Sequence, residues 1–333
     1  MKSEIKVILI LVLSGLLLTA AFPKLSQDRL AWLALVPLLW ALNDAGPREA
    51  FRRGLVFGIA HFLSLLYWLV PTMVIYGHLP VVLSVSILFI FAAVLSLLFI
   101  APLTCGFALA GRTPLRVLLF FPVFWVGFEY LRSFLFTGFP WELLGYSQHA
   151  RLQLIQISDI VGVYGVSGLI ALANAALFLA TLVVCRKTWR GRPVTGRMAI
   201  GGLAAAAVLV GLTWAYGEVR IREIDRLASV APKARIAVVQ GNIEQSQKWE
   251  PAFQAATIET YIRLSLSTRP QQPELIVWPE SAAPFYFLKE VPPTRRLLEG
   301  VVANGTHFLI GAPAFEMKGR AADYFNRAYL IGP

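Results

Sequence analysis

The sequence predicts an α-helical, multi-span membrane bundle (residues 1–217) followed by a partial α/β domain outside the cytoplasm (residues 218–333). The 333 residues are 57% hydrophobic and 15% charged, with a mean hydropathy of +0.65, which is more apolar than a soluble globular domain. Apolar segments long enough to cross a membrane recur through the first two thirds of the chain. After Tyr216 the apolar runs become short and are separated by Pro, Gly and Asn, which is typical of strands alternating with helices.

About seven segments are predicted to span the membrane, because roughly 20 helical residues cross a hydrocarbon core of about 30 Å. They are 5–22, 30–42, 51–70, 79–101, 115–135, 161–185 and 198–216. The second is short and carries Pro37, so a re-entrant or tilted piece is the alternative there. The first has the form of a secretory signal, but another apolar segment soon follows, and we interpret it as a retained span.

The distribution of basic residues predicts the orientation. With a cytoplasmic amino terminus, twelve Lys and Arg residues fall in the inside segments and four in the outside segments, as the positive-inside rule requires. Seven crossings then place everything after Tyr216 on the outer face. The net charge of +11 is spread along the membrane borders without forming one stripe, which argues against a nucleic-acid partner.

The second domain is predicted to alternate strands and helices. Strands are expected at 235–240, 274–278, 306–311 and 326–331, and helices at 251–267 and 293–303. Residues 218–226 form a charged, helix-compatible connector, and the domain as given ends directly after a strand. We therefore expect it to be incomplete.

General catalytic and metal-binding motifs are absent from the sequence. No phosphate-binding loop, HExxH or CxxC motif occurs, and the four histidines have no metal-ligand spacing. Cys105 and Cys185 lie far apart, in or at the ends of apolar spans, and are predicted to be two small buried residues rather than a disulfide. Neither a metal nor another cofactor is expected.

Glu280 is the leading candidate for a catalytic residue. It follows the predicted strand 274–278 and Pro279, at the carboxyl end of a buried strand, where open α/β folds present reactive groups. The alternative is a solvated loop acid that caps the next element.

Trp249 is the candidate for a substrate contact. It follows the predicted strand 235–240 and Gly241, which permits a tight turn beside a pocket. An exposed tryptophan could contact an acyl chain there, and a packing tryptophan is the alternative.

Two acids of the bundle are also candidates, since acids within a membrane are functional suspects by default. Glu129 stands three residues before Arg132 near the outer end of its span, and the simpler interpretation is an i,i+3 ion pair at the interface. Glu142 could face a lipid headgroup from the loop that follows.

The order of these motifs resembles the apolipoprotein N-acyltransferases, whose outer domain belongs to the nitrilase superfamily. The bundle is followed by VVQGNIEQSQKWEP at 238–251, LIVWPESAAPF at 275–285 and LIGAP at 309–313. The loop FPWELLGYSQ at 139–148 is also similar to that family. The resemblance covers essentially the whole chain.

This resemblance implies a bacterial inner-membrane enzyme with a nitrilase-like α-β-β-α domain in the periplasm, working as a monomer without a cofactor. Glu280 matches the proton acceptor of a Glu-Lys-Cys triad, and Trp249 a tryptophan near the substrate. The cysteine would take an acyl chain from a phospholipid as a thioester and pass it to the α-amino group of a diacylglyceryl-cysteine, the first residue of an apolipoprotein.

The sequence departs from the family pattern in one respect. The triad lysine and cysteine would lie beyond residue 333, and Lys289, Lys318, Cys105 and Cys185 do not match their motifs. We therefore expect the chain alone not to transfer acyl groups. Two rival hypotheses are a membrane-tethered amidase that uses water as the acceptor, and a non-catalytic transporter or lipid-binding membrane protein.

Overall fold

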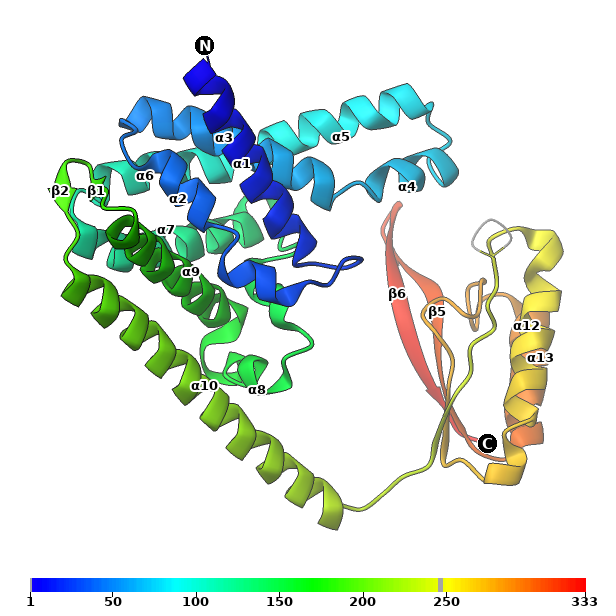
Figure 1. Ribbon diagram of the computed structural model, residues 1–333. Helices are drawn as coiled ribbons and strands as arrows, with labels where there is room; N and C mark the ends of the chain where they lie inside the picture. The colour runs from blue at the N-terminus through cyan, green and yellow to red at the C-terminus, as the bar shows by residue number, and fades with distance from the viewer. Residues whose placement is uncertain (1, 245–247) are drawn as a thin grey trace. The chain divides into compact units, whose positions relative to one another are not determined.

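The computed structural model describes residues 2–244 and 248–333, which form two compact units, Met1–Ser229 and Val230–Pro333 (Figure 1). Helix α10, Gly196–Val230, runs without interruption through the connector that the sequence analysis assigned to the second domain. Residues 218–229 therefore group with the helical unit.

The first unit is almost entirely helical. Its α-helices are α1 Lys2–Ala20, α2 Val36–Leu42, α3 Pro47–Leu65, α4 Leu69–Ile75, α5 Val81–Leu95, α6 Ala101–Ala110, α7 Pro114–Phe134, α8 Leu152–Ile155, α9 Ser158–Val184 and α10. Short irregular helices η1 Asp28–Trp32, η2 Ser96–Ile100, η3 Leu135–Thr137 and η4 Leu144–Gln148 connect them, with the two-residue strands β1 Thr188–Trp189 and β2 Arg192–Pro193 before α10.

Within the described residues, four helices are long and apolar enough to cross a membrane: Val81–Ala110, Pro114–Thr137, Ser158–Val184 and Gly196–Val230. A fifth crossing is possible if α3 and α4, which are bent by 50° at their junction, count as one broken span. The prediction of about seven spans is therefore not reproduced by these criteria.

The expected second span is the clearest correction. Its α-helical part, α2, has only 7 residues, and such a helix rises about 10 Å, far less than the hydrocarbon thickness. Pro37 lies in the first turn of α2, where its missing N–H is tolerated, and η1 precedes it as a separate turn. The segment is therefore broken between η1 and α2 and does not form one continuous spanning helix.

Asn174 of α9 supplies hydrogen bonds to this broken segment. The side chain is fully buried. Its Oδ1 accepts from the backbone N–H of Leu35 (2.9 Å), and its Nδ2 donates to the carbonyl oxygen of Ala31 (2.8 Å). A break in a helix at membrane depth is tolerated where a neighbouring helix satisfies the freed backbone groups in this way.

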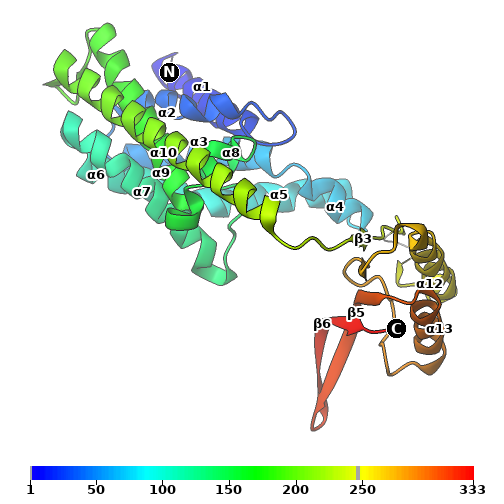
Figure 2. The same cartoon turned by 90° about the horizontal axis from the view of Figure 1, so that it is seen from below.

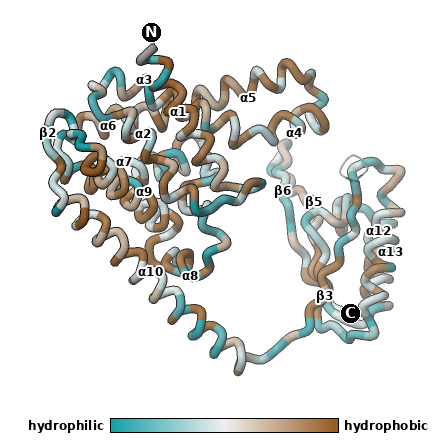
Figure 3. The backbone as a smooth tube through the Cα atoms, viewed as in Figure 1, coloured by the Kyte–Doolittle hydropathy of each residue, from teal (hydrophilic) through white to brown (hydrophobic). Residues whose placement is uncertain are grey.

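The outward surface of the bundle suits a hydrocarbon environment. Figure 3 shows hydrophobic colour along α5 and hydrophilic colour over the second half of α10. Val82 and Ile90 of α5 are 79% and 60% exposed, although they are large and apolar. Such a surface is expected of a membrane-embedded helix and is unusual on a soluble monomer.

The second unit contains one mixed four-stranded sheet with helices. Its elements are β3 Ile236–Val238, α12 Pro251–Leu266, η5 Arg269–Gln271, β4 Leu275–Val277, α13 Val291–Asn304, β5 His307–Lys318 and β6 Ala321–Ile331. The strand order is β3-β4-β5-β6, with β3, β4 and β5 parallel and β6 antiparallel to β5. The predicted alternation of strands and helices is present, and the last strand begins five residues before the predicted one.

Helices α12 and α13 pack side by side (Figures 1 and 2). A side chain at Gly300 would meet Ile262 at 2.8 Å, so glycine allows the two helices to approach closely. Trp278, which follows β4, is 3% exposed, lies 5.0 Å from the ring of Tyr261, and donates to Ser265 Oγ (2.8 Å). This tryptophan fixes the end of β4 to α12.

We predict that Asn174→Leu lowers the melting temperature of the purified protein. The change leaves the N–H of Leu35 and the carbonyl of Ala31 without these partners, and a buried unsatisfied polar group costs about 1–3 kcal/mol. Thermal unfolding in detergent measures the effect. Ser86→Leu is the control, since that exposed hydroxyl bonds only to Val82 O of its own helix. Equal melting temperatures of Asn174→Leu and the control would contradict the prediction.

Candidate active site

Glu280 lies where the chain leaves β4. The last sheet bond runs from the N–H of Trp278 to the carbonyl oxygen of Leu309 (2.9 Å), and Pro279 then turns the chain away. Glu280 is exposed, and Ser281 after it has a positive φ of 51°. The structure therefore places Glu280 at the carboxyl end of a parallel strand, as the sequence analysis expected.

Gly311 of β5 allows this turn to lie directly on the sheet. A Cβ at Gly311 would stand 2.7 Å from the nitrogen of Ser281 and 2.9 Å from Cα of Glu280, closer than real Cβ contacts. The carbonyl oxygen of Gly311 accepts a hydrogen bond from the N–H of Ala283 (3.1 Å). Because Gly311 has no side chain, the turn that carries Glu280 can lie directly against β5.

Two polar side chains contact Glu280. Nδ2 of Asn326, on β6, donates to Glu280 Oε1 (2.6 Å), and Nζ of Lys248 donates to the backbone oxygen of Glu280 (3.2 Å). The carboxylate is therefore oriented by an amide, while an ammonium group stands next to its backbone. A carboxylate held in this way can accept a proton from a partner at its exposed side.

Trp249 is brought close to this group through Lys248. Nζ of Lys248 lies 5.8 Å from the centre of the Trp249 ring, and Trp249 is 52% exposed, so it does not pack inside the unit. Residues 245–247 of the same motif lie outside the described residues. The two candidates chosen separately from the sequence, Glu280 and Trp249, thus contact the same lysine.

Sequence reasoning missed Asn326 as a partner of Glu280. Asn326 lay within a predicted strand, and only the strand register shows where it points. It pairs with Pro313, two positions from Gly311 on β5. Asn326 is the first residue of the predicted strand, next to Arg327, and nothing in this local sequence marked it as a partner of Glu280.

The expected ion pair between Glu129 and Arg132 is not formed. Both side chains are buried, and their charged atoms are not within ion-pair distance in the described part of the chain. Glu129 Oε1 instead accepts from the N–H of Leu144 (2.7 Å) and from Nε1 of Trp125 (3.0 Å), and Arg132 donates to the carbonyl oxygen of Trp141 (2.9 Å). Both residues bind the backbone of the loop 139–148.

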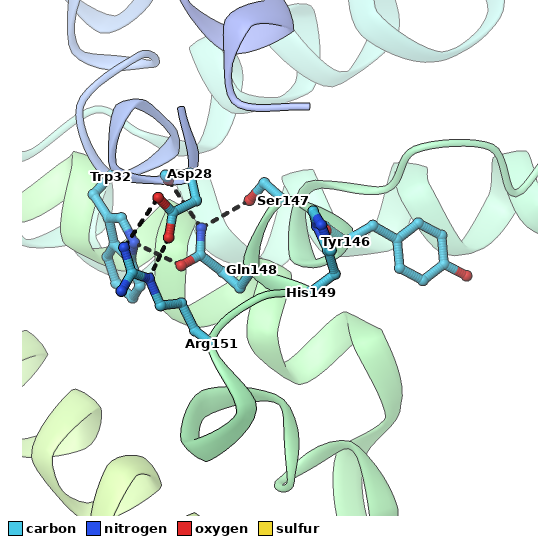
Figure 4. Close-up of polar contacts among 7 residues, drawn as sticks. All are labelled: Asp28, Trp32, Tyr146, Ser147, Gln148, His149 and Arg151. Atoms are coloured by element: carbon cyan, nitrogen blue, oxygen red, sulfur yellow. Dashed lines mark hydrogen bonds and ion pairs between the residues drawn. The ribbon is translucent and has the colours of Figure 1, made fainter. Parts of the chain in front are cut away.

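The end of this loop is fixed to η1 by Gln148 (Figure 4). Its Nε2 donates to the carbonyl oxygen of Asp28 (3.0 Å), and its Oε1 accepts from Nε1 of Trp32 (3.1 Å). Arg151 forms an ion pair with Asp28, which lowers the pKa of that carboxyl group although burial opposes the shift. Tyr146 points away from this cluster in Figure 4 and is 45% exposed.

Glu142 turns inward from the same loop at a positive φ of 47°. With Glu129 and Arg132 it lines a cavity of about 20 Å³, and its Oε2 is buried without a hydrogen-bond partner among the described residues. Burial raises the pKa of Glu142 to about 7, although the charge of Arg132 opposes the shift.

The cysteines and possible metal ligands provide no further site in the described residues. Cys105 is half-buried and Cys185 is exposed, so the prediction that both are buried is wrong for Cys185, which directly follows the last residue of α9. Neither forms a disulfide. No group of three or more His, Cys, Asp or Glu side chains is placed to hold a metal ion in the described part of the chain.

The long apolar helices and the α/β unit with its strand-end carboxylate define a multi-helical membrane protein that carries a candidate acid–base site. Residues 14–176 match the family model of the apolipoprotein N-acyltransferase N-terminal domain. A protein of Geobacter metallireducens named apolipoprotein N-acyltransferase is 41% identical over 98% of this chain and 60% of its own length. The chain belongs to the apolipoprotein N-acyltransferase family.

Other bacterial relatives carry the same name. The protein of Methylococcus capsulatus is 32% identical over 98% of this chain and 61% of its own length. That of Coxiella burnetii is 30% identical over 96% of this chain and 62% of its own length. The chain thus spans about three fifths of the length of these relatives.

We predict that the stability of the helical unit depends on the ionisation of Glu142. A carboxyl whose pKa rises on folding stabilises the folded state below its ordinary pKa of 4.5, and this stabilisation is lost as the pH rises through about 7. The melting temperature should therefore fall between pH 5 and pH 8 less in Glu142→Gln than in the unchanged protein. Glu223→Gln, at an acid 55% exposed, is the control and should keep the full pH dependence. An equal fall in Glu142→Gln would show that Glu142 is not responsible.

We also predict that Gly311→Val displaces the turn at Glu280. The new side chain would overlap Ser281, and overpacking of this kind costs about 1–3 kcal/mol. Hydrogen exchange should then be faster at the amide of Ala283, which Gly311 protects. Ala321→Val, at an exposed position of β6, should leave that exchange unchanged. Unchanged protection in Gly311→Val would mean that the turn does not depend on the missing side chain.

Proposed function

We propose that this chain contributes the membrane bundle and the proton acceptor of an apolipoprotein N-acyltransferase. The enzyme transfers an acyl chain from a phospholipid to the α-amino group of the N-terminal S-diacylglyceryl-cysteine of a lipoprotein. The observation that carries the proposal is Glu280, an exposed carboxylate at the end of a parallel strand, oriented by Asn326 in a chain of this family.

In the proposed reaction, the Glu280 carboxylate takes the proton of a cysteine thiol. The thiolate attacks the ester carbonyl of the phospholipid, the lysophospholipid leaves with a proton, and the acyl chain remains on sulfur as a thioester. The amine of the acceptor then attacks the thioester, which forms an amide and returns the thiol. A lysine is expected to stabilise the oxyanion of both steps.

The cysteine and this lysine match no residue of the chain as given. We place them in the part of the family's length that the chain does not span, and residues 218–333 in the first part of a nitrilase-like domain. The parallel order β3-β4-β5 with two intervening helices is compatible with that assignment.

Trp249 is proposed to contact the acyl chain or the lipidated acceptor. Its exposed ring can cover hydrocarbon while Lys248 keeps it next to Glu280. The same placement would let Lys248 attract the phosphate of the donor lipid.

We propose a location in the bacterial inner membrane, with the amino terminus in the cytoplasm, the second unit in the periplasm and the enzyme working as a monomer. The support is the excess of Lys and Arg in the segments expected inside.

A chimaera tests the role of Glu280. Residues 1–333 are joined to the remaining carboxyl-terminal part of the Geobacter metallireducens relative, which is 41% identical over the shared region. With phospholipid and diacylglyceryl lipopeptide, mass spectrometry should detect triacylated product. Glu280→Gln should lower the rate of thioester formation by about 100-fold or more, because it removes the general base.

Glu274→Gln is the matched control, since Glu274 directly precedes β4 at its other end and accepts a hydrogen bond from the backbone N–H of Arg235. It should keep full activity. Full activity of Glu280→Gln would remove Glu280 from the base role, and product from residues 1–333 alone would refute the need for further residues.

A further inference from the structure

Helix α10 is attached to the rest of the helical unit at two places. Near its beginning, Gly202 and Ala206 lie against Leu118 and Ala176. Further along, Tyr216 donates to both carboxylate oxygens of Asp159 (2.8 and 3.0 Å). Small residues at the first contact and a polar contact at the second keep α10 close to α9 without filling the space along its sides.

A groove of about 430 Å³ runs along one side of α10 (Figure 2 shows this helix across α9). Its walls are mostly apolar, and they include Leu177 of α9 with Leu203 and Val210 of α10. Its other lining residues come from η1, η4 and α8, among them Asp28, Arg29, Gln148 and Arg151. The groove therefore has apolar walls and one polar, charged end.

The length of the groove matches one leaflet of a bilayer. Leu203 and Trp214 both line it, and eleven residues of α-helix rise about 16 Å. Half of a hydrocarbon core is about 15 Å. Trp32 and Trp214 line the groove with the charged residues, as aromatic side chains do at a membrane interface.

The charge of the polar end favours an anion. Arg151 is paired with Asp28, so their charges cancel. Arg29 is exposed and forms no ion pair in the part of the chain that the structure describes. A guanidinium group at the end of an apolar groove complements a phosphate group attached to a hydrocarbon chain.

A second groove on the other side of α10 provides a contrast. It has about 850 Å³ and is lined by α7, α9 and α10, with Leu119, Val123 and Leu209 among its residues. It contains no charged residue. It can hold hydrocarbon, but it offers no charged group for a lipid headgroup.

We propose that the groove between α9 and α10 binds one resident phospholipid, with its phosphate on Arg29 and one acyl chain along α10. The lipid is a structural ligand, separate from the acyl donor, so the proposal is independent of the function assigned to Glu280. The bound acyl chain would also fill the space beside α10 that protein side chains leave open.

Native mass spectrometry of the protein purified in mild detergent tests this proposal, with added phosphatidylglycerol as the probe. One lipid per chain should remain bound. Arg29→Gln should weaken binding by about 10-fold to 100-fold, the effect of losing a charge-assisted hydrogen bond. Ala207→Phe should also reduce binding, because Ala207 is an exposed residue that lines the groove.

The controls are Arg116→Gln, at an exposed arginine of α7, and Ala205→Phe, at an exposed residue of α10 outside the groove. Both should bind lipid like the unchanged protein. Equal binding by all four variants, or an equal loss in the controls, would overturn the proposal. Displacement of the lipid by millimolar inorganic phosphate would also overturn it, since the site would then recognise free phosphate rather than a lipid.

Discussion

The helical unit depends on one constraint: backbone groups in irregular segments at membrane depth need partners from within the protein. Hydrocarbon offers no hydrogen bonds, so each break in a helix must be satisfied by a neighbouring side chain. Asn174 does this for the segment that joins η1 to α2, and Glu129 for the N–H of Leu144. In the loop between β1 and β2, which lies outside the predicted spans, Arg190 likewise donates to the carbonyl oxygens of Ala45 and Ala108 (2.7 and 2.5 Å).

The same constraint explains why Glu129 and Arg132, which are both buried in the bundle, do not pair with each other. Glu129 and Arg132 stand one helical turn apart, which would suit an ion pair on an exposed helix. The loop 139–148 has irregular backbone with unpaired N–H and C=O groups, and these groups bind the two side chains instead. The loop is thereby held in a defined shape, with Glu142 turned inward and Tyr146 outward.

In the first unit, polar side chains hold irregular segments in place. In the second unit, the glycine at position 311 does so by leaving space for a turn. Gly311 leaves room for the turn after β4, and this turn determines the position of Glu280. Asn326 and Lys248 then contact Glu280 from β6 and from the segment before α12. The position of the carboxylate therefore depends on three parts of the chain that are distant in sequence.

Local patterns were enough to predict most of the long helices, most strands and the two candidates Glu280 and Trp249, because hydropathy period and strand-end motifs lie within short windows. The short length of the second apolar segment and Pro37 indicated that it is not an ordinary span. The partners could not be predicted, because Glu280 and Asn326 are 46 residues apart and only the β5–β6 register brings them together. For the same reason, the sequence did not predict that Glu129 accepts a hydrogen bond from the N–H of Leu144 instead of pairing with Arg132.

The bond between Leu35 and Asn174 has a consequence for biosynthesis. The two residues are 139 positions apart, and at roughly 5–20 residues per second the ribosome needs about 7 to 28 s to travel between them. During that interval the amino-terminal segment has entered the membrane without the amide that completes it. Until α9 is made, the N–H of Leu35 and the carbonyl oxygen of Ala31 therefore need other hydrogen-bond partners.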